Sequence, residues 1–125
     1  MPGSQGNGHT TVAAVDLGSN SFHLLIARVL GDQVTVLDRL REPVRLAADL
    51  DSEGNLGERA LERMLAGLNR FRERLLDLPQ KNVRAVGTDT FRRVKQRKDL
   101  LARASSALGF PIEVLPGGEE ARLIY

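Results

Sequence analysis

The chain has 125 residues, of which 42% are hydrophobic, so it can bury one core, at the lower edge of what a layered α/β fold needs. Lys and Arg number 18 against 16 Asp and Glu, and a net charge of +2 is too small to indicate nucleic acid or a membrane as partner. The sequence contains no cysteine, which excludes disulfides, thiolate metal sites and cysteine nucleophiles and is compatible with a reducing cytoplasm.

Residues 1–10 are rich in Gly, Ser, Asn and Pro and contain no apolar run. This composition predicts a disordered tail rather than a signal peptide or an anchor. No later stretch approaches the roughly 20 apolar residues that are needed to span a bilayer. We therefore expect a soluble cytoplasmic protein in which residues 11–125 belong to one domain.

The first half of the domain is predicted to contain three strands and then a helix. Residues 11–15 form an apolar, β-branched run that stops at the polar segment 16–21, and residues 22–30 are again apolar. Gly31-Asp32 is typical of a two-residue hairpin leading into a third strand. Apolar residues then recur at helical spacing from Leu61 to Leu78, where Pro79 ends the pattern.

The second half alternates strands and helices. A strand at 83–86 leads through a turn at 87–90 to a helix around Leu100, closed by Gly109. A strand at 112–115 follows, and a further helix is predicted to begin near Glu119. The order β-β-β-α-β-α-β-(α) predicts a mixed sheet with helices packed on its faces.

Three polar turns follow three predicted strands, and strand ends are where open α/β sheets commonly bind ligands. In the first turn Gly18 allows close approach of the backbone, and Asp16 is suited to magnesium. Hydroxyl and amide groups there can hold phosphate oxygens; they belong to Ser19, Asn20 and Ser21. Composition alone favours a different interpretation, an ordinary turn.

The second turn offers Thr88 and a basic run that begins at Arg92 and Arg93 and ends at Lys98. Such a run can hold a polyanion, although a solvated helix end explains it about equally well. Arg92 lies nearest to the strand end and is the residue of this run that we expect to point inward.

The third turn places Glu119 and Glu120 at a helix start, where a carboxylate can act as general base on a water. Glutamates in a first helical turn also complement the helix macrodipole, so physics alone does not require a catalytic role. His23 follows the first turn, but a lone histidine at a strand start is more often structural, and we assign it no role.

Taken together, four strings resemble the exopolyphosphatase/guanosine pentaphosphate phosphatase family. The resemblance extends from about Thr11 to Tyr125. Two of the strings, the one that begins at Val15 and the one that begins at Gly118, are specific enough to separate this family from the actin-like ATPases and the sugar kinases. The strings are Val15-Asp16-Leu17-Gly18-Ser19-Asn20-Ser21-Phe22-His23, Val44-Arg45-Leu46-Ala47, Gly87-Thr88-Asp89-Thr90-Phe91-Arg92 and Gly118-Glu119-Glu120-Ala121-Arg122-Leu123-Ile124-Tyr125.

The resemblance implies a ribonuclease-H-like α/β fold of the actin, sugar-kinase and chaperone superfamily. It also implies that Glu120 is the catalytic base, because the family's signature places the base directly before the Ala-Arg dipeptide. Asp16 would lie near Mg²⁺. The phosphate-binding residues would be Gly18, Ser19, Asn20, Ser21, Thr88 and Arg92.

Two departures from the family pattern bear on activity. Arg93-Val94-Lys95-Gln96 stands where relatives carry an alanine and, later, an asparagine. Family members are also several times longer and contribute a second glycine-rich phosphate loop. The resemblance thus implies that this chain corresponds to the front part of the family's catalytic unit, and we expect it not to turn over substrate alone and to expose apolar surface where further elements would pack.

The favoured hypothesis is hydrolysis of the terminal phosphoanhydride bond of inorganic polyphosphate, with guanosine pentaphosphate, a nucleotide of the stringent response, as the second candidate substrate. Two competing hypotheses are a polyphosphate-binding module without hydrolysis and a sugar kinase, and the Glu119-Glu120-Ala121-Arg122 string disfavours the kinase. Nucleic acid is not expected as a partner, and relatives are commonly homodimers.

Overall fold

The computed structural model describes residues 9–116, which build one five-stranded sheet in the order β3-β2-β1-β4-β5. No helix in this part of the chain is long and apolar enough to cross a membrane. The strands are β1 (Thr10–Leu17), β2 (Ser21–Leu30), β3 (Gln33–Pro43), β4 (Val83–Gly87) and β5 (Ile112–Val114).

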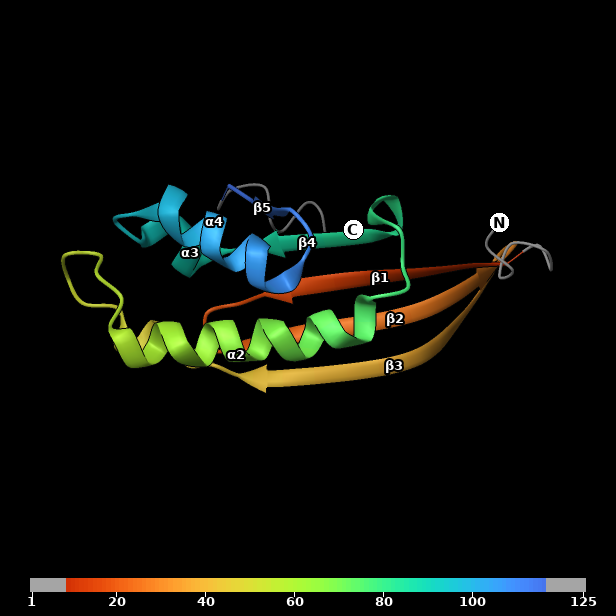
Figure 1. The fold of residues 1–125 in the computed structure, drawn as a ribbon, viewed down its shortest axis with the longest axis horizontal. Coiled ribbons are helices and arrows are strands. Elements are labelled where there is room, and N and C mark those ends of the chain that lie inside the picture. Colours follow the sequence, from red (N-terminus) through yellow and green to blue (C-terminus); the bar gives the residue numbers. More distant parts are fainter. Residues whose placement is uncertain (1–8, 117–125) are drawn as a thin grey trace.

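The sheet is mixed, as the sequence predicts. β2 pairs antiparallel with both β1 and β3, whereas β4 runs parallel to β1 and to β5. The carboxyl ends of β1 and β4 therefore lie at the same end of the sheet, on the left of Figure 1. We call this the site end, and the opposite end, which carries the β2–β3 hairpin tip, the far end.

β1 is longer than the apolar run 11–15 predicts. It begins at Thr10, the last residue of the predicted tail, and continues through Asp16 and Leu17. Asp16 pairs with His23, and Leu17 pairs with Phe22, so the two strands stay hydrogen-bonded close to the turn. The polar turn is consequently shorter than predicted, because pairing between strands overrides the polarity of Asp16.

The helices are α1 (Leu46–Asp49), α2 (Glu58–Leu75), α3 (Asp89–Arg93) and α4 (Arg97–Leu108), with a 3₁₀ turn at Gln80–Asn82. α2 ends at Leu75 rather than at Leu78, because the amide of Leu78 turns back to the carbonyl of Leu75. α1 and α3 are short helices that the sequence does not predict. α3 replaces the second half of the turn expected at 87–90.

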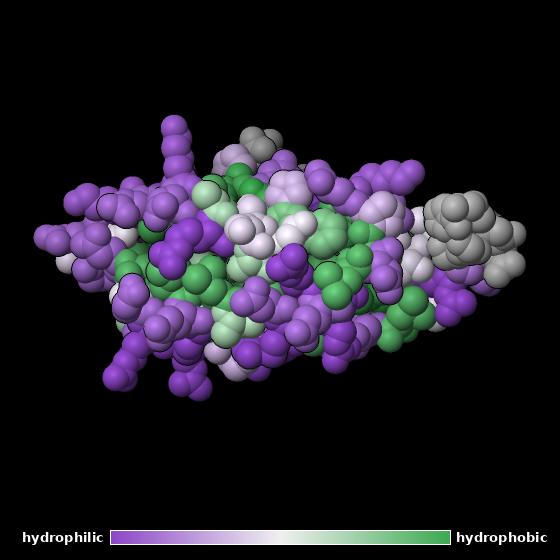
Figure 2. Space-filling view, viewed as in Figure 1, coloured by the Kyte–Doolittle hydropathy of each residue, from purple (hydrophilic) through white to green (hydrophobic). Residues whose placement is uncertain are grey.

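Both long helices cover the same face of the sheet, in front of the strands in Figure 1. Along β1 the odd-numbered residues Ala13 and Val15 are buried under them, while Ala14 and Asp16 on the other face are exposed. The expected mixed sheet with packed helices is thus confirmed, and within residues 9–116 the two long helices cover one of its faces. Figure 2 shows the resulting helical face, with hydrophobic side chains along its middle and hydrophilic ones around its rim.

The core lies between this face and α2, α3 and α4. Its largest fully buried side chains come from strands and helices alike. They are Leu17, Phe22, Leu24, Leu46, Met64, Leu68, Phe71, Leu75, Phe91 and Leu108. Phe22 directly follows the first turn and Phe91 directly follows the second. Because both rings are buried in the core, their packing holds the two turns in place.

The loop between α1 and α2 is fastened to the α3–α4 connection. The Asp51 carboxylate accepts hydrogen bonds from the amides of Asn55 and Glu53, and these bonds lower the pKa of Asp51. Gly54 has φ +86, and its carbonyl accepts a 2.8 Å hydrogen bond from the Lys95 amide. A Cβ atom at Gly54 would lie 2.9 Å from the Arg93 carbonyl oxygen, so the close approach requires glycine.

Candidate functional site

The first and second turns meet at the site end, although their residues lie far apart in the sequence. The Thr90 hydroxyl donates a 2.8 Å hydrogen bond to the Ser19 hydroxyl, a link across 71 residues. The Thr88 amide donates to the Leu17 carbonyl at 3.3 Å. The positions of the polar turns at strand ends predicted that these turns converge. For the first and second turns, which lie among the described residues, the structure confirms this prediction.

The first turn is a tight reversal in which three successive carbonyl groups accept hydrogen bonds. The Gly18 amide donates to the Ser21 carbonyl at 3.2 Å, and a Cβ at Gly18 would lie 3.1 Å from that oxygen. The Asn20 carbonyl accepts from the amides of Val44 and Arg45, and the Ser19 carbonyl accepts from the amide of residue 47.

This bonding fixes which polar groups of the turn point outward. The carbonyls of Ser19 and Asn20 are turned toward residues 44–47, so the Asn20 amide, which shares a peptide plane with the Ser19 carbonyl, points away from them. The amides of Ser19 and Asn20 make no hydrogen bond to another described residue. Backbone amides that remain available, together with hydroxyl and amide side chains, can accommodate an anion. The turn thus has the chemistry that phosphate oxygens require.

Arg92 connects the second turn to the start of the third. It lies on α3 and is half-buried, and its guanidinium donates a 2.7 Å hydrogen bond to the Leu115 carbonyl. The Leu115 amide donates in turn to the Gly87 carbonyl at 3.0 Å. Arg93, by contrast, is exposed, so the structure agrees with the prediction that Arg92 is the inward-pointing residue.

Thr88 is half-buried at the start of α3, where its side chain makes no capping hydrogen bond. Glu119 and Glu120, the predicted helix start that contains the catalytic base, lie outside the described residues, as does the rest of the third string. Their roles stay predictions.

Asp16 lies on the open face of the sheet, next to the turn. It lines a shallow hollow of about 420 Å³ together with His23, Arg39 and Arg41. The described residues contain no group of three or more His, Cys, Asp or Glu side chains that could enclose a metal ion. Within residues 9–116, Asp16 is the only carboxylate that lines this hollow. Magnesium can be held by one or two carboxylates together with the phosphates of a substrate, and the role of Asp16 near Mg²⁺ stays a prediction.

Sequence reasoning missed two residues of this end. Thr90 is 1% exposed and is the buried polar side chain that links the turns. Arg45 adopts a left-handed conformation beside the first turn, with φ 53 and ψ 43. Both belong to strings that resemble the family, and that resemblance was the signal available to find them.

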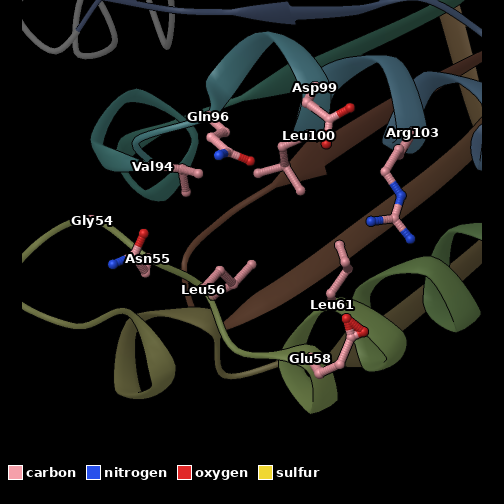
Figure 3. Close-up of a pocket in the computed structure, with 10 residues that line it drawn as sticks. All are labelled: Gly54, Asn55, Leu56, Glu58, Leu61, Val94, Gln96, Asp99, Leu100 and Arg103. Atoms are coloured by element: carbon pink, nitrogen blue, oxygen red, sulfur yellow. The ribbon is translucent and has the colours of Figure 1, made fainter.

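A second cavity, of about 260 Å³, lies between the 51–57 loop and the helices. Figure 3 shows Leu61 of α2 and Leu100 of α4 facing one another across it, with Glu58, Asp99 and Arg103 around them. None of the predicted site residues lines this cavity. This cavity is a gap between packed elements and is not part of the site that the polar turns form.

A mixed sheet with polar turns gathered at the carboxyl ends of parallel strands is typical of α/β domains that bind ligands at this edge. The Ppx/GppA phosphatase family model matches residues 25–125, and the chain belongs to this family.

Solved structures agree. An exopolyphosphatase-like protein is 33% identical, with a TM-score of 0.82 over 93% of this chain. An exopolyphosphatase from Cytophaga hutchinsonii is 30% identical, with a TM-score of 0.83 over 91% of this chain. The Aquifex aeolicus PPX-GPPA enzyme is 26% identical, with a TM-score of 0.77 over 86%. The chain spans 36% of the length of each of these proteins. They confirm the expected α/β fold.

Proposed function

We propose that this chain contributes the phosphate-binding part of an exopolyphosphatase, which hydrolyses the terminal phosphoanhydride bond of inorganic polyphosphate and releases phosphate. The observation that carries the proposal is the hydrogen bond between Thr90 and Ser19, because it joins the two predicted phosphate-binding turns into one site. The similarity to an exopolyphosphatase at 30% identity supports polyphosphate over guanosine pentaphosphate as substrate.

In this proposal the first turn holds the terminal phosphoryl group. Its available amides and the side chains of Ser19, Asn20 and Ser21 donate to phosphate oxygens, and Gly18 permits the close approach. Thr88 and Arg92 approach the same group from the second turn. The hydrogen bond from Arg92 to the Leu115 carbonyl holds the guanidinium in place, which limits the entropy lost when substrate binds.

Glu120 is proposed as the base that orients and deprotonates a water molecule for in-line attack on the terminal phosphorus. Asp16 would hold Mg²⁺ together with substrate oxygens, and the ion would offset the negative charge of the transferring group. Arg92 and the turn amides stabilise the same charge from the protein side.

The experiment measures magnesium-dependent phosphate release from polyphosphate and from guanosine pentaphosphate. It uses a full-length protein that carries this chain, with Glu120→Gln as test and Glu119→Gln as matched control. We expect Glu120→Gln to lower kcat by at least about 100-fold with polyphosphate still bound, because general bases typically contribute 10²–10⁴-fold. Glu119→Gln should change kcat by less than about fivefold.

Three results would contradict the proposal. Binding of polyphosphate without phosphate release would favour the non-hydrolytic binding module. Equal effects of Glu120→Gln and Glu119→Gln on kcat would contradict the assignment of Glu120 as the base. Phosphate release from guanosine pentaphosphate, with none from polyphosphate, would show that guanosine pentaphosphate is the substrate. The 125-residue chain alone is expected to bind polyphosphate weakly and to release no phosphate.

A further inference from the structure

Arg45 is the one residue other than glycine with a positive φ in the part of the chain that the structure describes. A left-handed conformation costs free energy for a residue with a Cβ atom, and it persists where surrounding contacts impose it. Such an outlier at the edge of a binding site is a reason to ask what its side chain does there.

The surrounding contacts hold the backbone at Arg45 from both sides. The amides of Val44 and Arg45 both donate to the Asn20 carbonyl, at 3.0 and 2.9 Å. On the other side, the Arg63 guanidinium donates to the Val44 carbonyl at 3.1 Å. Val44 and Leu46, the neighbours of Arg45 in the chain, are buried in the core. The conformation of Arg45 is thus fixed by the same turn that we propose to bind phosphate.

This conformation places the exposed Arg45 side chain in a shallow cavity of about 450 Å³ beside the turn. The other residues that line it are Asn20, Ser21, Arg41, Pro43 and Ala48. The lining contains two arginines and no carboxylate. Arg41 also lines the hollow that contains Asp16, so the cavity adjoins the proposed substrate site.

Three of the nearby carboxylates are already paired with other arginines, and the fourth, Asp16, lines the same hollow as Arg41 without an ion pair to it. Asp38 pairs with Arg74, Glu42 pairs with Arg70 at 2.7 Å, and Asp49 pairs with Arg63. All three partners lie on α2, on the covered face of the sheet.

Within residues 9–116, the side chains of Arg41 and Arg45 make no hydrogen bond or ion pair. Two arginines without carboxylate partners, next to a phosphate-binding turn, form a site for a second anionic group.

We propose that Arg45, assisted by Arg41, binds a non-terminal phosphoryl group of linear polyphosphate while the first turn holds the terminal one. The inference rests on the proposed function and deepens it, because it assigns the residues that distinguish a chain of phosphates from a single phosphate. Binding energy from a non-reacting part of the substrate then helps to position the reacting end.

Tripolyphosphate and orthophosphate are the two probes, because the first can reach both groups and the second only one. Calorimetric titration uses the 125-residue chain and its variants Arg45→Gln and Arg28→Gln. Arg28 is an exposed arginine of β2 and serves as the control for loss of one positive charge. We expect Arg45→Gln to weaken tripolyphosphate about tenfold, and orthophosphate by less than about twofold, because a lost charge-assisted hydrogen bond is worth about one power of ten.

The variant Arg45→Gly distinguishes a binding role of Arg45 from a purely structural one. Glycine adopts the left-handed conformation without steric cost, so this variant should keep or raise the melting temperature. It should weaken tripolyphosphate binding as much as Arg45→Gln does. A lower melting temperature with unchanged tripolyphosphate binding would assign Arg45 to the fold and overturn the inference.

The outcomes separate this inference from the proposed function. If the unaltered chain binds tripolyphosphate and Arg45→Gln behaves like Arg28→Gln, the second subsite is wrong and the proposed function stands. Equal loss of both anions in Arg45→Gln would place Arg45 at the terminal group and also overturn the inference. An unaltered chain that binds neither anion would contradict the proposed function, and the subsite with it.

Discussion

The two ends of the sheet differ in how firmly they are held. At the site end, hydrogen bonds join residues 17–20, 44–47 and 87–92, and the fully buried Phe22 and Phe91 lie beneath them. At the far end, β2 and β3 extend as a hairpin whose Leu30 is 47% and Val34 65% exposed. The site end is thus held more firmly, because hydrogen bonds between separate segments and buried aromatic side chains fix it, whereas the hairpin tip has only its own strand pairing.

The largest expected effect comes from the core beneath the site end. Phe91→Ala should lower the free energy of unfolding by about 3–5 kcal/mol, because it leaves a cavity under Gly87. Val34→Ala at the far end should cost less than about 1 kcal/mol. Urea unfolding followed by circular dichroism measures both. If Phe91→Ala does not fold, Phe91→Leu should show a smaller loss, and equal losses for Phe91→Leu and Val34→Ala would contradict the contrast between the ends.

Two glycines with positive φ sharpen the contrast. Gly31 at the far end has φ +57 and open space around it, while Gly54 has φ +86 and the Arg93 carbonyl close by. Gly31→Ala should cost about 1–2 kcal/mol from the left-handed conformation alone. Gly54→Ala should cost about 1 kcal/mol or more beyond that, since the Lys95 connection must shift. Thermal unfolding compares them, and an equal cost would show that the 51–57 loop is not fastened.

Thr90 tests the link between the two turns. Thr90→Val preserves the shape of the side chain but removes the donor to Ser19, and we expect a loss of about 1–2 kcal/mol. Orthophosphate binding should weaken together with stability, because Ser19 loses its orientation. Thr35→Val, on the exposed part of β3, is the matched control and should change neither quantity. Unaltered orthophosphate binding in Thr90→Val would show that the hydrogen bond from Thr90 to Ser19 is not needed for phosphate binding.

The smallest effect concerns pH. The hydrogen bond from Arg70, together with its charge, lowers the pKa of Glu42 below its ordinary value of 4.5, against the opposing effect of burial. Its contribution to stability is therefore present above pH 4.5 and is lost as the pH falls through the lowered pKa. Because Arg70 is 56% exposed, the contribution should stay under about 1 kcal/mol.

The stability difference between the unaltered chain and Glu42→Gln, measured at about pH 7 and about pH 3, should shrink at the lower pH. Asp32→Asn at the hairpin tip is the control for removal of one carboxylate, since Asp32 has no ion pair among the described residues. A Glu42→Gln difference that is constant with pH would show that the pair with Arg70 contributes nothing.

The sequence by itself determined the five strands, the two long helices and their order, but not the short helices α1 and α3. Apolar periodicity located the strands and the two long helices, Gly31-Asp32 located the hairpin, and Gly109 ended α4. These signals are local, since each depends on residues a few positions apart. The same local chemistry placed Gly18, Ser19 and Asn20 in a turn that the structure confirms.

The tertiary structure decided which of those elements contact one another and through which residues. The bond from Thr90 to Ser19 spans 71 residues, and pairing between strands carried β1 through Asp16. The left-handed conformation of Arg45 comes from the Asn20 carbonyl, and no residue next to Arg45 in the chain indicates it. Such contacts depend on strand register and on which face the helices cover, and periodicity in a single sequence contains neither.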